Sequence, residues 1–498
     1  ATFEVSIKYS EIMIRRNILF FTLALVLTLV FFRGMSGNEF FFIHDEFLIL
    51  GKIESLNSFF VYDSSNLGAS NTTSLFVNFF DRLYYATLYH FDASTHIAQE
   101  GLFFLKLFLV LAVPYTGFRK LAELFLGHRK ENIWILLVSL WYAFNTYTLI
   151  YWNSNGFALT LLICYALAPL TLYYIHKSLF GADRLLTDKL KAVILIYLMS
   201  FALPLFLSFV LFVLIYVAIY ALLVYARPTS PFPMRECDQG EKKSDFVTSL
   251  GQTNTSFRAL FKNMILLFIL YLPFTYVYLL IMYGMFSVSS PTVNLVGGET
   301  YGLLQGGILY QLLMWFSWGI YTYWEQRSIF TFYEYFRSLP SFAAPFFLYA
   351  IIAYGIYKKN LKNVHFLSLF ATLLLFLVLV KGPQDPFGAV YLYFLEHVPG
   401  FRAFRSPDSK FGFVIVLTFA VMLLFSLKHY RKKLFIALLS LVILIQGFPL
   451  LTGLAIRGEN GEHSYDRVIH ISKEYQELAS FLNDSRTYGY VTTLPSVA

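Results

Sequence analysis

The residues of this sequence with the clearest capacity for chemistry are two adjacent carboxylates, Asp45 and Glu46, which follow His44 just beyond the first long apolar segment. Acidic residues close to a bilayer are costly, and those that occur there are often functional. A carboxylate can take a proton from an attacking hydroxyl group, so the pair could supply a general base. An acidic pair at such a boundary can equally be a solvated part of a loop, and the surrounding elements decide between these interpretations.

The composition places the chain among membrane proteins. Of its 498 residues, 57% are hydrophobic and only 14% are charged, and the mean hydropathy is +0.60, whereas soluble domains carry about a quarter charged residues. The formal net charge of +8 does not indicate a nucleic-acid partner, because the Lys and Arg residues cluster in short loops between apolar runs, as membrane topology requires. We therefore expect an all-α polytopic membrane protein.

Apolar runs of roughly 17–25 residues, long enough to cross a bilayer, predict about eleven transmembrane helices. These cover residues 17–33, 100–118, 133–152, 157–176, 192–207, 208–226, 263–285, 341–357, 364–380, 411–427 and 434–453. The fifth and sixth form one apolar stretch, which we divide at Pro204 because it is too long for a single span. One kinked, tilted helix is the alternative, and it would invert the orientation of every later segment.

The distribution of basic residues orients these spans. With a cytoplasmic N-terminus, every inner connection is basic, and the longer outer segments are sparse in Lys and Arg, on both sides of Pro204. The inner basic residues are Lys8, Arg15, Arg16, Arg119, Lys120, Arg129, Lys130, Lys177, Arg184, Lys189, Arg227, Arg235, Lys242, Lys243, Arg258, Lys358, Lys359, Lys362, Lys428, Arg431, Lys432 and Lys433. We expect a multi-pass plasma-membrane protein with an extracytoplasmic C-terminus, whose first span is an uncleaved signal anchor.

This topology predicts the domain organisation. Residues 1–455 form the transmembrane domain, with a flexible cytoplasmic linker at 228–258, and residues 456–498 begin an extracytoplasmic soluble domain that continues beyond the sequence. The substantial outer segments are 34–99, 286–340, 381–410 and 454–498. Within the first two, residues 75–91 and 308–336 have apolar residues at helical spacing, and we expect interfacial helices there.

The sequence contains no P-loop, no Gly-rich dinucleotide fingerprint and no zinc-ligand spacing. It also lacks an obvious internal repeat of the kind that secondary transporters show. The outer face of a membrane has no supply of nucleotide sugars. An enzyme that works there on sugars therefore needs an activated donor carried by the membrane.

The order of elements and three sequence runs resemble the GT-C superfamily of integral membrane glycosyltransferases. The runs are LWYAFNTY at 140–147, ALAPL at 166–170 and VPGFRAFRSPDSK at 398–410, and similar runs occur in mycobacterial arabinofuranosyltransferases of the AftD type and in YfhO-like membrane proteins. The resemblance covers most of the chain. It implies a GT-C architecture and transfer of a sugar from a polyprenyl-phosphate donor to an extracytoplasmic glycan, lipid or protein acceptor, with inversion.

The resemblance also implies the position of the catalytic base, an acidic residue at the start of the first outer segment. Only Asp45 and Glu46 occupy that position, and we favour Asp45 as the base, with Glu46 as an alternate base or a supporting partner. His44 is interpreted as a hydrogen-bond partner, because no second metal ligand stands at helical spacing from it. The fallback bases, later in the same segment, are Asp63, Asp81 and Asp92.

Cations must stabilise the departing lipid phosphate. Arg402, Arg405 and Lys410 are the first candidates, because arginine matches phosphate in bidentate geometry and their segment lies at the depth expected for a lipid phosphate. Anchoring to lipid headgroups is the alternative role for these residues. Weaker candidates for phosphate binding are Arg82, Arg327 and Arg337. The sequence predicts no required cofactor and leaves open whether a divalent cation assists.

Two other functions are compatible with the sequence. A transporter or flippase for lipid-linked substrates predicts functional charges inside the spans, where Lys106 is one of few. A non-catalytic membrane scaffold derived from a glycosyltransferase predicts that Asp45 can be lost without consequence.

Overall fold

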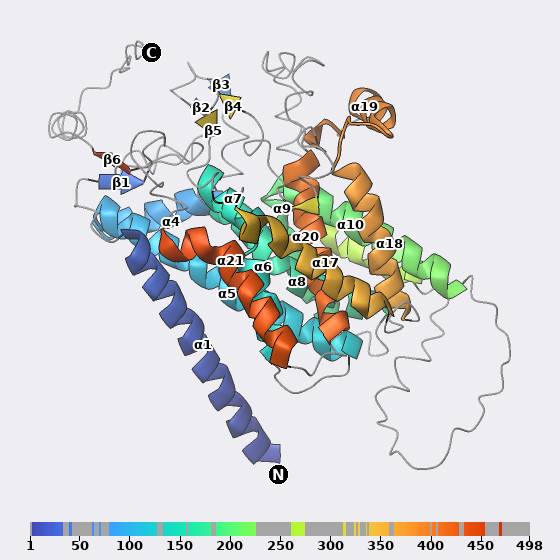
Figure 1. Cartoon of the computed structure of the whole chain (residues 1–498), viewed down its shortest axis with the longest axis horizontal. Helices are drawn as coiled ribbons and strands as arrows, with labels where there is room; N and C mark the ends of the chain where they lie inside the picture. Colours follow the sequence, from blue (N-terminus) through green and yellow to red (C-terminus); the bar gives the residue numbers. More distant parts are fainter. Residues whose placement is uncertain are drawn as a thin grey trace.

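The structure is a computed structural model of the chain. It describes residues 2–32, 39–41, 62–63, 69–70, 79–126, 133–155, 158–180, 186–225, 260–273, 312–314, 323–324, 327–328, 335, 338–357, 363–398, 401–404, 407–427, 433–453 and 468–470. These residues are mainly α-helical, and three antiparallel pairs of very short strands accompany the helices (Figure 1).

The helices follow the predicted apolar runs. They are α1 (Thr2–Phe32), α4 (Phe79–His90), α5 (Thr95–Leu126), α6 (Ile133–Ala143), α7 (Thr146–Asn155), α8 (Leu159–Phe180), α9 (Leu186–Ser200), α10 (Leu203–Tyr225), a helix at Leu260–Pro273, α17 (Leu339–Tyr357), α18 (Val364–Leu379), α19 (Gly388–His397), η4 (Phe401–Phe404), α20 (Pro407–Leu427) and α21 (Lys433–Thr452). Within the described residues, six helices are long and apolar enough to cross a membrane, and four shorter helices are also apolar. This is compatible with a multi-pass membrane protein, while the count of eleven spans stays a prediction.

The long apolar stretch around Pro204 forms two helices. α9 ends at Ser200 and α10 begins at Leu203, so the break falls at Phe201 and Ala202, slightly before the predicted point. Pro204 lies in the first turn of α10, where a missing backbone N–H leaves no helical hydrogen bond unmade. α9 starts beside the end of α8, where Lys177 pairs with Asp188, and α10 returns to that end, where Tyr220 contacts Phe180. The chain therefore reverses between the two helices, and the interpretation as one kinked helix is wrong.

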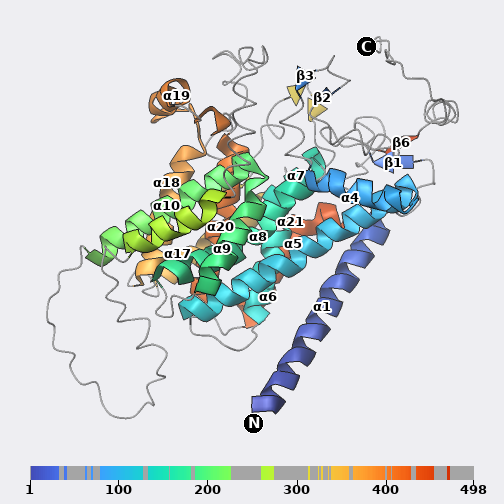
Figure 2. The same cartoon turned by 180° about the vertical axis from the view of Figure 1, so that it is seen from behind.

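α20 forms the centre of the helical bundle. All its side chains from Phe411 to Ser426 are buried, and it packs against α6, α10, α17 and α18. Figures 1 and 2 show it surrounded from both sides. A helix that is apolar around its whole circumference is expected in such a central position, because every side must be covered by a neighbour or by lipid.

α5 connects the first helix to this bundle. α1 packs against α5 through Phe20 and Tyr115, whose ring centroids are 5.6 Å apart, and the N-terminal end of α1 diverges from the other helices (Figures 1 and 2). On its other side α5 approaches α8 closely at Gly117, where a Cβ atom would lie 2.6 Å from the backbone nitrogen of Leu170. Glycine at this position therefore sets the distance between the two helices.

We call the end of the bundle that carries α4, α7 and α19 the upper end (Figure 1). β1 (Glu39–Phe41) pairs there with β6 (Val468–His470), so the segment after α1 lies beside the segment after α21. β2 (Tyr62–Asp63) pairs with β3 (Ala69–Ser70). The predicted linker at 228–258 lies outside the described residues, as does the predicted domain at 456–498 apart from β6.

The two predicted interfacial helices have different outcomes. The helix expected at 75–91 is confirmed over the described part as α4. The helix expected at 308–336 is wrong at its described centre, where β4 (Tyr323–Trp324) pairs with β5 (Arg327–Ser328). Aromatic residues favour strands as well as membrane interfaces, and this explains why helical spacing alone gave the wrong element.

Candidate functional site

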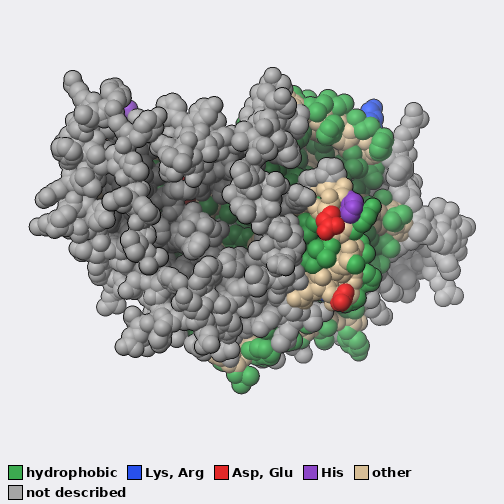
Figure 3. Space-filling view, turned by 90° about the horizontal axis from the view of Figure 1, so that it is seen from above, with side chains coloured by type: hydrophobic (Ala, Val, Ile, Leu, Met, Phe, Trp, Pro, Cys, Tyr) green, Lys and Arg blue, Asp and Glu red, His purple; other side chains and the backbone are tan. Residues whose placement is uncertain are grey.

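The structure describes only some of the residues predicted to act chemically. His44, Asp45, Glu46, Arg405 and Arg337 lie outside the described residues. Strand β1 ends at Phe41, four residues before Asp45. Seen from above, the described part of the upper face is mostly apolar, with a few acidic and histidine side chains (Figure 3).

The remaining phosphate-binding candidates belong to separate elements. The backbone of Arg402 is part of η4, and that of Arg327 is part of β5. Lys410 lies in the first turn of α20 and is half-buried. Arg82 lies on α4 and is only 4% exposed, so most of its surface is covered within the protein.

A buried ion pair joins α4 to the bundle. Nζ of Lys106 on α5 lies 3.3 Å from Oδ1 of Asp81 on α4, and the two residues are 2% and 8% exposed. The other carboxylate oxygen of Asp81 accepts a 2.8 Å hydrogen bond from the backbone N–H of Leu159. Leu159 begins α8, so Asp81 also satisfies a donor at the N-terminus of a neighbouring helix.

This geometry gives Asp81 a structural role. Both of its carboxylate oxygens are engaged inside the protein, so the group is poorly placed to take a proton from an incoming acceptor. The other fallback bases differ from it. Asp92 is exposed just after α4, with a φ of 56°, and the backbone of Asp63 lies in β2.

Tyr84 lies in close contact with α5. Its hydroxyl group occupies the space that a Cβ atom would take at Gly101 of α5. Burial raises the pKa of Tyr84 to about 12. The phenol therefore remains protonated under physiological conditions, and α4 presents a neutral side chain to the helix below it.

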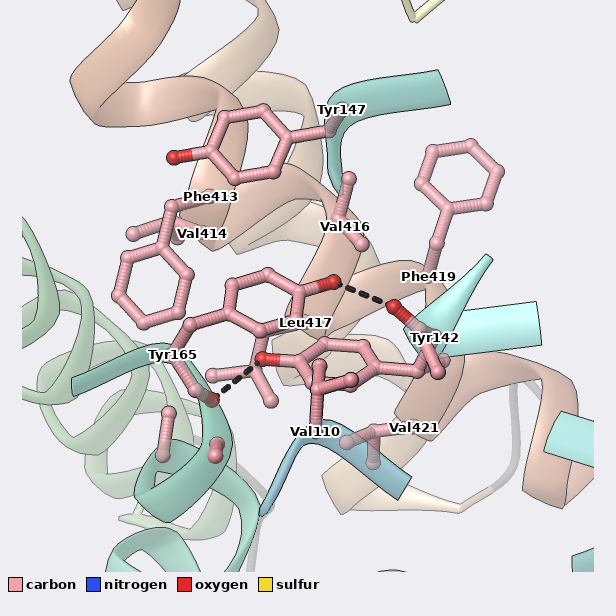
Figure 4. Packing of buried hydrophobic residues seen from close by; sticks show 14 of the residues in the cluster. Val110, Tyr142, Tyr147, Tyr165, Phe413, Val414, Val416, Leu417, Phe419 and Val421 are labelled. Atoms are coloured by element: carbon pink, nitrogen blue, oxygen red, sulfur yellow. Dashed lines mark hydrogen bonds between the residues drawn. The ribbon is translucent and has the colours of Figure 1, made fainter. Parts of the chain in front are cut away.

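The connection between α6 and α7 holds a second buried polar cluster. The hydroxyl of Tyr142 donates to the carbonyl oxygen of Tyr165 at 2.9 Å, and the hydroxyl of Tyr165 donates to the carbonyl oxygen of Tyr142 at 2.7 Å. Figure 4 shows this reciprocal pair against Val110 and the side chains of α20. The side-chain amide of Asn145 donates to the Tyr165 hydroxyl at 3.0 Å. The pair joins α6 to α8 by side-chain bonds to backbone carbonyls.

The same connection is bonded to the start of α20. The hydroxyl groups of Tyr147 and Tyr151 both donate to the carbonyl oxygen of Ser409, at 2.8 Å and 3.1 Å. The backbone N–H of Ser409 donates to Oδ1 of Asp408 at 2.8 Å, and Asp408 is 1% exposed. Lys410 follows directly, so the α7 tyrosines fix the backbone beside a predicted phosphate-binding residue.

A third set of bonds adds α21 to this cluster. Nε1 of Trp141 donates to Oε1 of Gln446 at 2.9 Å, and Nε2 of Gln446 donates to the hydroxyl of Thr146 at 3.2 Å. Buried polar groups need such partners, because an unmade hydrogen bond in an apolar interior is costly. Bonds to three other helices, α8, α20 and α21, therefore hold the residues of 140–147 in one arrangement.

The lower half of the bundle contains a buried histidine pair. Nε2 of His176 on α8 lies 3.4 Å from Nδ1 of His365 on α18, and the hydroxyl of Tyr216 on α10 lies 2.9 Å from the same Nδ1. The ring of Tyr220 stacks on His365 with centroids 4.6 Å apart. Within the described residues, no group of three or more His, Cys, Asp or Glu side chains is arranged to hold a metal ion.

The sequence predicted most of the helices, but it did not predict which buried polar side chains bond to one another. Lys106 was visible as a charge inside an apolar run, and this predicts a partner without identifying it, since Asp81 lies on a different element. The tyrosine hydroxyl bonds leave no sequence signal, because Tyr occurs both in apolar packing and at membrane interfaces. Comparison with known proteins assigns no family, since no protein family model, curated protein or solved structure matches this chain.

Proposed function

We propose that this chain is a membrane glycosyltransferase of the GT-C kind. It transfers a sugar from a polyprenyl-phosphate donor to an extracytoplasmic glycan, lipid or protein acceptor. In this proposal the upper end is the outer side of the plasma membrane, the N-terminus is cytoplasmic and the C-terminus is extracytoplasmic. The eleven predicted spans form the transmembrane domain.

The observation that carries the proposal is the contact between two of the sequence runs behind the resemblance and the residue that directly precedes the third. Tyr147, in the run at 140–147, bonds to Ser409 in the run at 398–410. Tyr142 bonds reciprocally to Tyr165, which immediately precedes the run at 166–170. Runs that are far apart in the chain thus build one cluster near the upper end, which supports a shared role for them.

The described elements around the acidic pair also support the proposal. β1 precedes Asp45 by four residues and is paired with β6. Later in the same segment, α4 is fixed to α5 and α8 through Asp81. The first outer segment is therefore attached to the bundle on both sides of Asp45 and Glu46, as a catalytic segment above a lipid-linked substrate needs to be.

The proposed reaction needs one base and cations. Asp45, or Glu46 in its place, takes the proton of the acceptor hydroxyl group. At the same time the oxygen of that hydroxyl group bonds to the anomeric carbon of the donor sugar. The bond between that carbon and the phosphate oxygen breaks with inversion, and the lipid phosphate keeps the electron pair. Arg402, Arg405 and Lys410 stabilise the phosphate charge. The leaving group is already an anion, so a second carboxylic acid is dispensable.

A transfer assay tests this proposal. Membranes containing the wild-type chain are incubated with a panel of radiolabelled polyprenyl-phosphate sugars and matched acceptors. We expect label to move from one donor into an acceptor, and the anomeric configuration of the product to be inverted. If no donor supports transfer although the purified protein is folded, the result would contradict the proposed glycosyltransferase activity. It would favour the non-catalytic membrane scaffold.

The buried histidine pair favours a second candidate, a transporter or flippase for lipid-linked substrates. His176, His365 and Tyr216 join three helices by polar contacts inside the bundle, and intramembrane ionisable groups often mark transport pathways. In liposomes, a flippase would move a fluorescent polyprenyl-phosphate sugar between leaflets, and His365→Phe would stop that movement. A glycosyltransferase would leave the lipid in its leaflet and transfer only the sugar.

A further inference from the structure

α19 is oriented differently from the helices beside it. Figures 1 and 2 both show it end-on at the upper end, above α18 and α20, whose axes run along the bundle. A helix that lies across the direction of its neighbours is parallel to the membrane plane if those neighbours cross the bilayer. α19 is too short, at 10 residues, to cross a bilayer itself.

The protein holds one side of α19 firmly. Tyr391 and Leu395 are buried, and the Tyr391 hydroxyl donates to the carbonyl oxygen of Phe404 at 2.6 Å. In the turn before the helix, Nζ of Lys381 donates to the carbonyl oxygens of Asp385 and Pro386 at 2.8 Å and 3.1 Å. These bonds fix the rotation of α19 about its axis, so its exposed side is set by the fold.

The exposed side divides into an apolar and a polar stripe. We define the apolar stripe as Phe387, Val390, Phe394 and Val398, which are all exposed and are spaced three or four residues apart. We define the polar stripe as Tyr393, Glu396 and His397, which are also exposed. His397 belongs with Tyr393, because the two rings stack with centroids 4.3 Å apart.

Exposed apolar residues also lie on α18, the helix that precedes α19. Leu374, Leu375 and Val378 on the upper half of α18 are exposed apolar residues, and in a membrane-crossing helix such a surface faces the acyl chains. Only the short turn after α18 separates them from Phe387. A helix with a fixed protein side, an apolar side and a polar side has the amphipathic character of a helix lying in a membrane interface.

We propose that α19 is an interfacial helix that inserts its apolar stripe into the acyl region of the leaflet at the upper end, with the polar stripe among headgroups and water. The partner is the lipid surface itself. Since η4 packs directly on α19, with the rings of Tyr391 and Phe401 5.4 Å apart, α19 also fixes the level of the segment that carries Arg402. The proposal does not require the chain to be an enzyme.

Spin labels in lipid nanodiscs test this assignment in the full chain. Cys237 is replaced by Ser, and Cys164 is retained because it is buried. Single substitutions Val390→Cys, Phe394→Cys and Glu396→Cys are labelled, with Leu374→Cys on α18 as a lipid-facing reference. All four positions are exposed, so the labels do not disturb the packed core.

The measurement is the ratio of collisions with oxygen, which partitions into lipid, to collisions with a water-soluble nickel chelate. We expect a ratio several-fold higher at 390 and 394 than at 396, approaching that at 374. Ratios at 390 and 394 as low as that at 396, with 374 still lipid-like, would place the whole helix in water and overturn the proposal. Ratios at all three positions as high as that at 374 would place the polar stripe in the acyl region and would overturn it too. Low collision rates with both reagents at 390 and 394, with 374 still lipid-like, would mean that protein covers the stripe and would also overturn it.

Discussion

At the scale of single residues, the most informative feature is the Asp81–Lys106 pair. The sequence identified Lys106 as a charge inside an apolar run and Asp81 as a fallback base, but it did not connect them. Their distance of 3.3 Å and the bond from Leu159 to Asp81 follow from how α4 folds back onto the bundle. Pairing of this kind depends on tertiary structure, and no local pattern in the sequence encodes it.

Removing one member of this pair should be strongly destabilising. Lys106→Met leaves the Asp81 carboxylate buried without its cation, and we expect the free energy of unfolding to fall by about 3–5 kcal/mol. In the double variant Asp81→Asn, Lys106→Met, the free energy of unfolding should fall by less than the sum of the losses in the two single variants. The reason is that the double variant buries no unpaired charge. Denaturation of the purified variants in one detergent measures these differences.

The Arg119–Glu123 pair provides a matched control for this cycle. It lies on the same helix, with a 3.2 Å contact and partly exposed side chains, and such pairs contribute at most about 1 kcal/mol. Glu123→Gln should therefore change stability little. A loss for Lys106→Met as small as that for Glu123→Gln would contradict the anchoring role of Asp81.

A tyrosine at the same scale predicts a dependence on alkaline pH. Burial raises the pKa of Tyr84 to about 12 in the folded chain, above the value of about 10 expected in the unfolded chain. Its stabilising contribution is therefore complete below pH 10 and is lost as the pH rises toward 12. We expect the free energy of unfolding to fall less between pH 10 and 12 in Tyr84→Phe than in the wild type, as measured by denaturation at each pH. Identical profiles would contradict the buried position of the Tyr84 hydroxyl against α5.

At the scale of elements, the sequence predicted most helices and missed those whose position depends on packing. The division of α9 from α10 was predicted from length and basic loops. α19 was not predicted as a helix, because its 10 residues carry apolar side chains on two sides, so no clear period marks it. The strands β4 and β5 lie where a helix was expected for a related reason. Aromatic residues are common both in strands and at membrane interfaces, so their spacing alone does not identify a helix.

The contact between α5 and α8 gives a prediction at this scale. A Cβ atom at Gly117 would lie 2.6 Å from the backbone nitrogen of Leu170, and backbone cannot move without shifting a whole helix. We expect Gly117→Ala to lower the free energy of unfolding by about 1–3 kcal/mol. Gly447→Ala is the control, because its nearest neighbour is a side-chain atom of Phe144 at 3.2 Å, and a larger loss at Gly447 would contradict this account.

At the scale of the whole molecule, six of the described helices are long and apolar enough to cross a membrane, while the predicted orientation rests on the distribution of basic residues. The native Cys237 lies in the predicted cytoplasmic linker, and Cys164 is buried. In intact cells, a membrane-impermeant thiol reagent should therefore leave the wild type unlabelled and label it after permeabilisation. Asp92→Cys, at an exposed position beyond α4, should be labelled without permeabilisation, and the reverse pattern would contradict the topology.

The candidate site could be predicted only in part at this scale. The sequence runs at 140–147 and 398–410 were identified from resemblance, and their contact through Tyr147 and Ser409 required the fold. Asp45 and Glu46 were identified from their place after the first span. Their catalytic role stays a prediction, because they lie outside the described residues.

The most direct test of this account compares sugar transfer by the wild type with transfer by Asp45→Asn, Glu46→Gln and the double variant in matched membranes. A general base contributes about 10²- to 10⁴-fold to a rate, so we predict a loss of that size in Asp45→Asn or in the double variant, with donor binding retained. Transfer that continues at the wild-type rate in the double variant would contradict the central claim.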